Sequence, residues 1–394
     1  MRKIAVISVA RSDYGILRPL LRRLEQADDI QLQLIVAAGH FPPEFGSTWR
    51  EIEADGIPIA AEVDCTLAAD RPGSIVRSMA LATLGVSQAF ERLRPDFAVV
   101  LGDRAEMHAA AVAAVPFLIP LVHIAGGTLS LGAIDDSFRH SITKLAHVHF
   151  AETQCCADRI IQMGEEPWRV HVTGALGLDN AYGLPMLPLE EINRRFGLDI
   201  AAPPVLVTFH PETREAGAAA RHIDALLDGL QQGLESPDVP IVFTAPNADA
   251  EGRIIIGAIE RFVKDRPAAW FVRHLGTEAY FSLMRQARLM VGNSSSGLVE
   301  AASFKLPVVN VGGRQDGRLA PPNVVSVPAA ASAIAEAVRQ TISLQFKSAL
   351  KSLDNPYGDG TAAPRMLDLL RTLPVGPDLV RKHFHRVMGA GSPS

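Results

Sequence analysis

Short apolar runs alternate with longer amphipathic stretches along the first half of the chain. The apolar runs predict β-strands, and the stretches between them have apolar residues at helical spacing. The predicted strands are residues 4–9, 31–36, 57–63, 97–101, 120–124 and 170–173, and the predicted helices are 15–27, 73–93, 104–115 and 135–146. Strands that are apolar throughout and separated by helices indicate a parallel sheet covered on both faces.

The segment 182–204 interrupts this pattern with several prolines and glycines around a short predicted helix at 189–196. The alternation then starts again, with strands at 205–209, 239–243, 269–272, 289–292 and 307–311, and a last helix follows at 362–373. We therefore expect an α/β protein with two Rossmann-like, doubly wound domains facing a cleft at the carboxyl ends of both sheets. The expected divisions are residues 1–184, 185–373 and a tail at 374–394.

Composition and charge exclude several classes of protein. Hydrophobic residues make up 48% of the 394 residues and the net charge is −5, so full cores are expected and binding to nucleic-acid phosphates is not. The three cysteines have no metal-binding spacing and indicate a reducing, cytoplasmic location. The longest apolar stretch, 109–122, contains two prolines and is too short to span a membrane. The apolar run at the N-terminus ends in Arg11 and Asp13, which favours a buried strand over a signal peptide.

Polar clusters follow the predicted strands in both halves. The segment 292–297, GNSSSG, lies between a strand and a helix, where free backbone N–H groups suit a diphosphate or where a serine simply caps the helix. Asp103 and Glu106 follow the strand at 97–101 and are either cleft carboxylates or the ordinary acidic start of a helix. In the segment 135–140, Asp135 and Arg139 share a helix face, as do Asp136 and His140, either as surface ion pairs or as a cleft acid with an anion-binding arginine.

Further clusters lie after other predicted strands. His210 precedes a proline at a strand end, where a histidine is either an acid, a base or phosphate ligand, or a structural residue. Asn247 and Asp249 suit sugar or base hydroxyls and suit an ordinary turn equally well. Arg11 and Arg314 supply cations after two more strands. The recurrence of these clusters at one end of the strands is typical of a cleft that binds a phosphorylated, hydroxyl-rich ligand.

These motifs resemble, in the same order along the chain, those of the hydrolysing UDP-N-acetylglucosamine 2-epimerases of the bacterial sialic-acid-pathway type. The resemblance covers roughly residues 3–373 and rests on SVARSDYG, VLGDRAEM, HIAGG with IDDSFRHSITK, FHPET, PNADA, VGNSSSGLVEAASF and GGRQDGR. It implies a glycosyltransferase-B-like pair of Rossmann domains that acts as a homodimer on a UDP-sugar. It also implies a reaction without a metal or nicotinamide cofactor. In that reaction, loss of the C2 proton and of UDP gives a glycal, and water then adds with inversion at C2, releasing N-acetylmannosamine from UDP-N-acetylglucosamine.

The resemblance also implies roles for particular residues. Asp103 and Asp135 match catalytic carboxylates, and His210 lies near the diphosphate and assists departure of the leaving group. Ser294, Ser295 and Glu300 match residues that hold the diphosphate and ribose. The other expected contributors to the UDP and sugar pocket are Arg11, Arg139, Asn247, Asp249, His274 and Arg314.

Two positions depart from the family pattern. Members commonly carry an acid or histidine where this chain has Ala125, and many carry glutamate where it has Thr128. Either Glu106, Asp135 or Asp136 takes over the missing role, or the substrate or reaction differs. Thr128→Glu would raise turnover if the chain is only a weakened epimerase. The leading prediction is a hydrolysing UDP-N-acetylglucosamine 2-epimerase for the synthesis of sialic-acid-like sugars. The alternative is the same reaction on UDP-2,4-diacetamido-2,4,6-trideoxyglucose of the legionaminic-acid pathway, a modified sugar that the roomier, less charged pocket mildly favours. A glycosyltransferase and a non-catalytic nucleotide-sugar-binding protein remain as alternatives.

Overall fold

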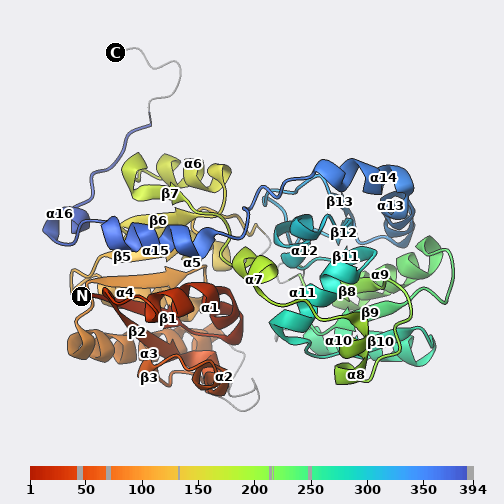
Figure 1. Ribbon diagram of the computed structural model, residues 1–394, viewed down its shortest axis with the longest axis horizontal. Helices are drawn as coiled ribbons and strands as arrows, with labels where there is room; N and C mark the ends of the chain where they lie inside the picture. Colours follow the sequence, from red (N-terminus) through yellow and green to blue (C-terminus); the bar gives the residue numbers. More distant parts are fainter. Residues whose placement is uncertain are drawn as a thin grey trace. The chain divides into compact units, whose positions relative to one another are not determined.

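The computed structural model describes residues 1–41, 48–67, 72–131, 134–212, 215, 217–246 and 251–387. The chain forms two compact units (Figure 1). The first unit contains residues 1–128, 134–179 and 357–394, and the second contains residues 129–133 and 180–356. Each unit is built around one parallel sheet, so the predicted pair of doubly wound α/β domains is confirmed.

The first unit has a seven-stranded parallel sheet in the order β3-β2-β1-β4-β5-β6-β7. The strands are β1 (Arg2–Ser8), β2 (Ile30–Ala37), β3 (Ile59–Val63), β4 (Phe97–Leu101), β5 (Leu121–Ile124), β6 (Val148–Ala151) and β7 (Val170–Val172). Every residue of β4, β5 and β6 is buried. This burial on both faces explains why those strands are apolar along almost their whole length. The helices between them are α1 (Arg11–Glu25), α2 (Trp49–Ala54), α3 (Pro72–Leu93), α4 (Ala105–Ala114), α5 (Asp135–Leu145) and α6 (Gln154–Gln162).

The second unit has a six-stranded parallel sheet in the order β10-β9-β8-β11-β12-β13. Its strands are β8 (Val205–Thr208), β9 (Ile241–Thr244), β10 (Ala269–Val272), β11 (Leu289–Gly292), β12 (Val308–Val311) and β13 (Val324–Val327). Its helices are α8 (Leu189–Phe196), α9 (Ala219–Gly233), α10 (Gly252–Lys264), α11 (Gly276–Gln286), α12 (Ser296–Val299), α13 (Ala331–Ile342) and α14 (Leu344–Ala349). The helix α7 (Leu178–Gly183) lies where the chain passes from the first unit to the second.

The strand order reverses direction at one place in each sheet. In the first unit the reversal lies between β1 and β4, and in the second between β8 and β11. Ligands of open α/β sheets bind outside the carboxyl ends of the strands at such a reversal, because the connections on its two sides run to opposite faces and leave a crevice. The loops that begin at residues 9, 102, 209 and 293 are therefore the expected binding positions.

The C-terminal segment differs from the expected domain division. Helix α15 (Ala362–Thr372), expected in the second domain, packs against α1 of the first unit, and Met366 and Leu370 are buried in that unit's core (Figure 1). The segment that follows, expected as a solvated tail, is also attached. Arg169 donates to the carbonyl of Leu379 at 2.7 Å, and the Lys382 ammonium lies 2.9 Å from the Glu165 carboxylate. Local sequence gave no sign of this return, because α15 is an ordinary amphipathic helix that suits either core.

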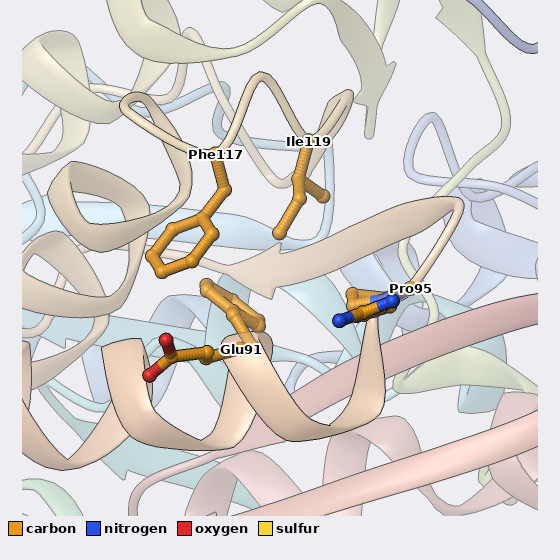
Figure 2. Close-up of a pocket in the computed structure, with 6 residues that line it drawn as sticks. Glu91, Pro95, Phe117 and Ile119 are labelled. Carbon is orange, nitrogen blue, oxygen red and sulfur yellow. The ribbon is translucent and has the colours of Figure 1, made fainter.

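An open pocket in the first unit is lined by none of the candidate site residues. It is lined by the end of α3 and the loop between α4 and β5, with Phe117 and Ile119 pointing toward the helix (Figure 2). The Phe90 and Phe117 rings meet edge to face, with centroids 6.3 Å apart. Within the described ranges, no helix combines the length and the apolar character that a membrane crossing requires.

Candidate active site

Asp103 and Arg139 form an ion pair at the carboxyl edge of the first sheet. Asp103 follows β4 after Gly102, whose φ of +71° turns the chain, and Arg139 comes from α5. The Arg139 side chain is only 4% exposed, whereas that of Asp103 is 24% exposed. Arg139 also donates to the carbonyl of Thr128 at 2.8 Å and lies 3.9 Å from Asp136. The arginine therefore joins the loops after β4 and β5.

Asp135 lies close enough to this pair for the charge of Asp103 to change its pKa. The pKa of the Asp135 carboxyl is raised, first by burial and then by the negative charge of Asp103, against smaller opposing effects of Arg104 and Arg139. Two neighbouring carboxylates that cannot both ionise freely tend to retain a proton between them. The raised pKa favours the protonated form of Asp135, which is the form that a general acid requires.

His123 is buried beneath the same loops and is neutral. Burial lowers its pKa to about 3, and its Nε2 lies 2.8 Å from the Gly102 carbonyl while its Nδ1 lies 3.2 Å from the Thr143 hydroxyl. A carbonyl can only accept, so Nε2 carries the proton and donates to Gly102. This histidine fixes the turn that presents Asp103.

The loop after β5 is tightly constrained. Ala125 has a φ of +62°, a left-handed conformation that costs a non-glycine residue free energy. Gly127 has a φ of +74°, and a Cβ there would lie 2.3 Å from the Cys156 carbonyl. Gly127 is thus required by close packing against α6, and Gly126 by close packing against His123, because a Cβ on Gly126 would lie 2.8 Å from His123 Nδ1.

Thr128, which the sequence presented as a departure from the family pattern, is buried and contacts a carboxylate from the next strand. Its hydroxyl donates to Glu152 Oε2 at 3.1 Å. Glu152 directly follows β6, and sequence analysis missed it because it missed that strand. The signal was present, since Glu152 ends the apolar run of β6 just as Asp103 follows that of β4.

The start of α1 is joined to the loop after β4. Arg104 donates to Asp13 at 3.3 Å and to the Ser12 hydroxyl at 3.1 Å, and both acceptors lie in the first turn of α1, which follows β1 at the reversal of strand order. Asp13, which sequence analysis did not select, is buried, and burial raises its pKa. Arg11 is exposed at the start of α1, and Glu106 is half-buried in the first turn of α4.

In the second unit, His210 is held by its backbone. Asn293 accepts from the His210 N–H at 2.7 Å and donates to the His210 carbonyl at 2.8 Å. The two loops at the reversal between β8 and β11 are thereby fixed to each other. Burial, with a smaller contribution from Arg314, lowers the pKa of His210 to about 3, so the imidazole is neutral.

Ser294 and Ser295 lie in the turn after β11. A Cβ on Gly292 would lie 2.0 Å from the Thr208 carbonyl, so only glycine allows β11 to approach β8 this closely. The helix that follows, α12, has only four residues, which is less than the sequence pattern suggested and leaves little helix dipole. Any anion here would depend on the hydroxyls and backbone N–H groups of the turn. The Tyr280 ring reaches the same turn, and burial raises the pKa of its hydroxyl.

The remaining candidates of the second unit are distributed around this turn. Arg314 donates to the carbonyl of Asn293 at 3.1 Å, and Gln315 donates to the same oxygen at 2.8 Å. Glu300 is half-buried just after α12, and His274 is exposed after β10. The predicted binding residues Asn247 and Asp249 lie outside the described residues.

Comparison with known proteins identifies the class of this fold and then the family. A crystal structure of UDP-GlcNAc 2-epimerase from Neisseria meningitidis bound to UDP-GlcNAc matches 95% of this chain and 100% of its own, with a TM-score of 0.80 and 18% identity. The fold is therefore the glycosyltransferase-B-like pair of Rossmann domains. The family model described as UDP-N-acetylglucosamine 2-epimerase matches residues 22–371.

Two curated relatives cover nearly the whole chain. The UDP-N,N'-diacetylbacillosamine 2-epimerase (hydrolyzing) of Legionella pneumophila is 35% identical over 382 residues, which are 97% of this chain and 99% of the relative. The polysialic acid biosynthesis protein P7 of Escherichia coli is 33% identical over 357 residues, 91% of this chain and 90% of the relative. The chain belongs to the UDP-N-acetylglucosamine 2-epimerase family.

Proposed function

We propose that this chain is a hydrolysing 2-epimerase that converts a UDP-linked 2-acetamido sugar and water into UDP and the free sugar inverted at C2. The observation that carries the proposal is the Asp103–Arg139 pair, with Asp135 beside it, at the carboxyl edge of the first sheet. The hydrogen on C2 is weakly acidic, so its removal and its replacement from the opposite face need positioned acid and base groups. Asp103 and Asp135 can meet that need, because the raised pKa of Asp135 favours the acid form of one of the two carboxyl groups.

The second unit has groups suited to the UDP end of the substrate. As the bond between C1 and the diphosphate breaks, negative charge grows on the diphosphate oxygen. Preorganised donors lower the energy of that charge more than flexible water does. Arg314 supplies a cation beside neutral His210, and the hydroxyls of Ser294 and Ser295 supply donors in the turn after β11. We expect the imidazole of His210, because it is neutral, to donate a hydrogen bond to the diphosphate and not to supply a second positive charge.

For the sugar, we propose UDP-2,4-diacetamido-2,4,6-trideoxyglucose as the preferred substrate and UDP-N-acetylglucosamine as the second candidate. The first is another name for the UDP-N,N'-diacetylbacillosamine in the name of the Legionella pneumophila relative, and the second is the sugar nucleotide in the description of the family model. The uncharged side chains of Ala125 and Thr128 favour the first, because a 4-acetamido, 6-deoxy sugar offers fewer hydroxyls to polar partners.

Incubation of the purified protein with each UDP-sugar in heavy water tests this proposal. A hydrolysing 2-epimerase releases UDP in equal amount to a free sugar that carries deuterium at C2, both of which are measured by proton NMR. The preferred substrate is the one with the higher kcat/KM when both compete in one tube. Release of unlabelled sugar, or turnover only after an acceptor is added, would instead support a glycosyltransferase. Binding of both UDP-sugars without turnover would support the non-catalytic alternative.

A further inference from the structure

Glu152 occupies the third of three adjacent loop positions at the carboxyl edge of the first sheet. Asp103 follows β4, Thr128 follows β5 and Glu152 follows β6, and β5 pairs with both neighbours in parallel register. Neighbouring strands lie about 4.8 Å apart, so the strands that carry the two carboxylates are about 10 Å apart. The two carboxylates therefore stand at different positions along the same edge of the sheet, one on each side of the loop that follows β5.

The two carboxylates are connected through the loop between them. The Thr128 hydroxyl donates to Glu152 Oε2 at 3.1 Å, and the Thr128 carbonyl accepts from Arg139 at 2.8 Å. Arg139 in turn forms the ion pair with Asp103. The hydroxyl of this buried threonine therefore contacts one acidic side chain directly, and its carbonyl is linked to the other through Arg139.

Glu152 differs from a structural carboxylate in its electrostatic surroundings. Glu165, a buried carboxylate of the same unit, lies within ion-pair distance of Lys144, His149 and Lys382. Across the described part of the chain, Glu152 has no such cation partner, and its negative charge contributes to the raised pKa of the Cys156 thiol. A half-buried carboxylate that is held by one hydroxyl and neutralised by no cation remains available as a base.

We propose that Glu152 is a catalytic carboxylate of this chain and removes the C2 proton of the UDP-sugar, while Thr128 positions it. This inference rests on the proposed function. In the first step the C2–H bond breaks and its proton passes to a Glu152 carboxylate oxygen. The electron pair forms the C1–C2 double bond of the glycal, and the C1–O bond breaks with its electrons going to UDP.

The Asp103–Asp135 pair then acts from the opposite side. It delivers its proton to C2 of the glycal, and water bonds to C1. The proton that the water loses returns to the Asp103–Asp135 pair, and the proton on Glu152 passes to solvent. The two steps together consume one UDP-sugar and one water and release UDP, the inverted sugar and one proton. That proton balances the additional negative charge that free UDP carries.

The test separates the two steps by supplying either the UDP-sugar or the 2-acetamidoglycal together with UDP. For Glu152→Gln we expect UDP release from the UDP-sugar to fall about 10²- to 10⁴-fold, the usual contribution of one acid–base group. Hydration of the supplied glycal should fall less than about tenfold, and Glu152→Asp should regain part of the UDP release. Asp103→Asn should lose glycal hydration as well. The dissociation constant of UDP, measured by calorimetry, should stay within about twofold of wild type in the Glu152 variants.

Positioning by Thr128 is measured separately. Thr128→Val removes the hydroxyl and keeps the shape, so kcat should fall about three- to tenfold with KM unchanged, and Thr128→Ser should restore kcat. UDP release by Glu152→Gln within about threefold of wild type would overturn the inference. Equal losses in both half-reactions would also overturn it, because they indicate a structural role. A wild-type protein that releases no UDP from either UDP-sugar would instead overturn the proposed function, and this inference with it.

Discussion

Substitution Asp103→Asn removes one negative charge at the edge of the first sheet and changes the side chain's shape very little. The Arg139 guanidinium then loses its carboxylate partner while its side chain stays 4% exposed. The partners that remain include the Thr128 carbonyl at 2.8 Å and Asp136 at 3.9 Å. The substitution therefore tests both a stabilising contact and a proposed catalytic group.

The size of each effect follows from the burial of the pair. Breaking a fully buried ion pair costs about 3–5 kcal/mol, and an exposed pair contributes about 0–1 kcal/mol. Because Asp103 is 24% exposed and Arg139 keeps other partners, we expect a loss of about 1–3 kcal/mol in the free energy of unfolding. At about 2–4 °C per kcal/mol, the melting temperature should fall by about 2–12 °C. Turnover should fall about 10²- to 10⁴-fold.

The assay combines thermal unfolding with UDP release measured from pH 5 to pH 9. Removal of the Asp103 charge lowers the pKa of Asp135, since that charge helps to raise it. Any residual activity that needs protonated Asp135 should therefore be lost at lower pH than in wild type as the pH rises. Turnover within about threefold of wild type, together with an unshifted melting temperature, would refute the assignment of Asp103.

Three other predictions concern the loops around the site. Gly292→Ala should abolish UDP binding or soluble expression, because the new Cβ would lie 2.0 Å from the Thr208 carbonyl. Gly257→Ala is the control, because its Cβ would meet no atom nearer than 3.7 Å. UDP calorimetry on both variants checks this. Thr128→Glu should lower turnover, contrary to the expectation from sequence alone, because it brings a second carboxylate to within hydrogen-bond distance of Glu152; a rise in kcat would contradict this. For His123, a pKa of about 3 against about 6.5 in the unfolded chain means that the unfolded state binds more protons below pH 6.5. Its contribution to stability is therefore complete above that pH and is lost as the pH falls toward 3. In urea unfolding, His123→Gln should reduce the slope of the unfolding free energy against pH, between pH 4 and 6, by up to about 1.4 kcal/mol per pH unit. An unchanged slope would show that another group is responsible.

The central strands were predictable from sequence because burial on both faces leaves a continuous apolar run. Strand β4 has the predicted bounds, and β10 and β11 do as well. Two strands were missed for different physical reasons. Strand β6 is preceded by His147 and interrupted by His149, so no more than two of its apolar residues are consecutive; the His149 ring lies 3.2 Å from Glu165. Strand β13 lies at the sheet edge and is half-exposed, so its apolar character is weaker.

The candidate site was predictable as a set of loops but less so as a set of contacts. Asp103 was selected because it follows an apolar strand, yet helical spacing pointed to Asp135 and Asp136 around Arg139 and His140. His140 does lie 3.4 Å from Asp136, whereas Arg139 reaches across to Asp103 from 36 positions further along. Such a pair depends on how two strands and a helix come together, which no local pattern contains.

The return of α15 to the first unit has a consequence for how the protein is made. The carboxylate of Asp179 accepts from the N–H groups of Ala362 and Ala363 at 2.9 and 2.8 Å, and Met366 and Leu370 fill the core behind them. During translation, the unit that begins first must therefore wait for residues near 370 to leave the ribosome. The second unit, whose last residue is Pro356, is complete before it. Nascent chains should accordingly acquire protease resistance in the middle of the sequence before they acquire it at the amino terminus.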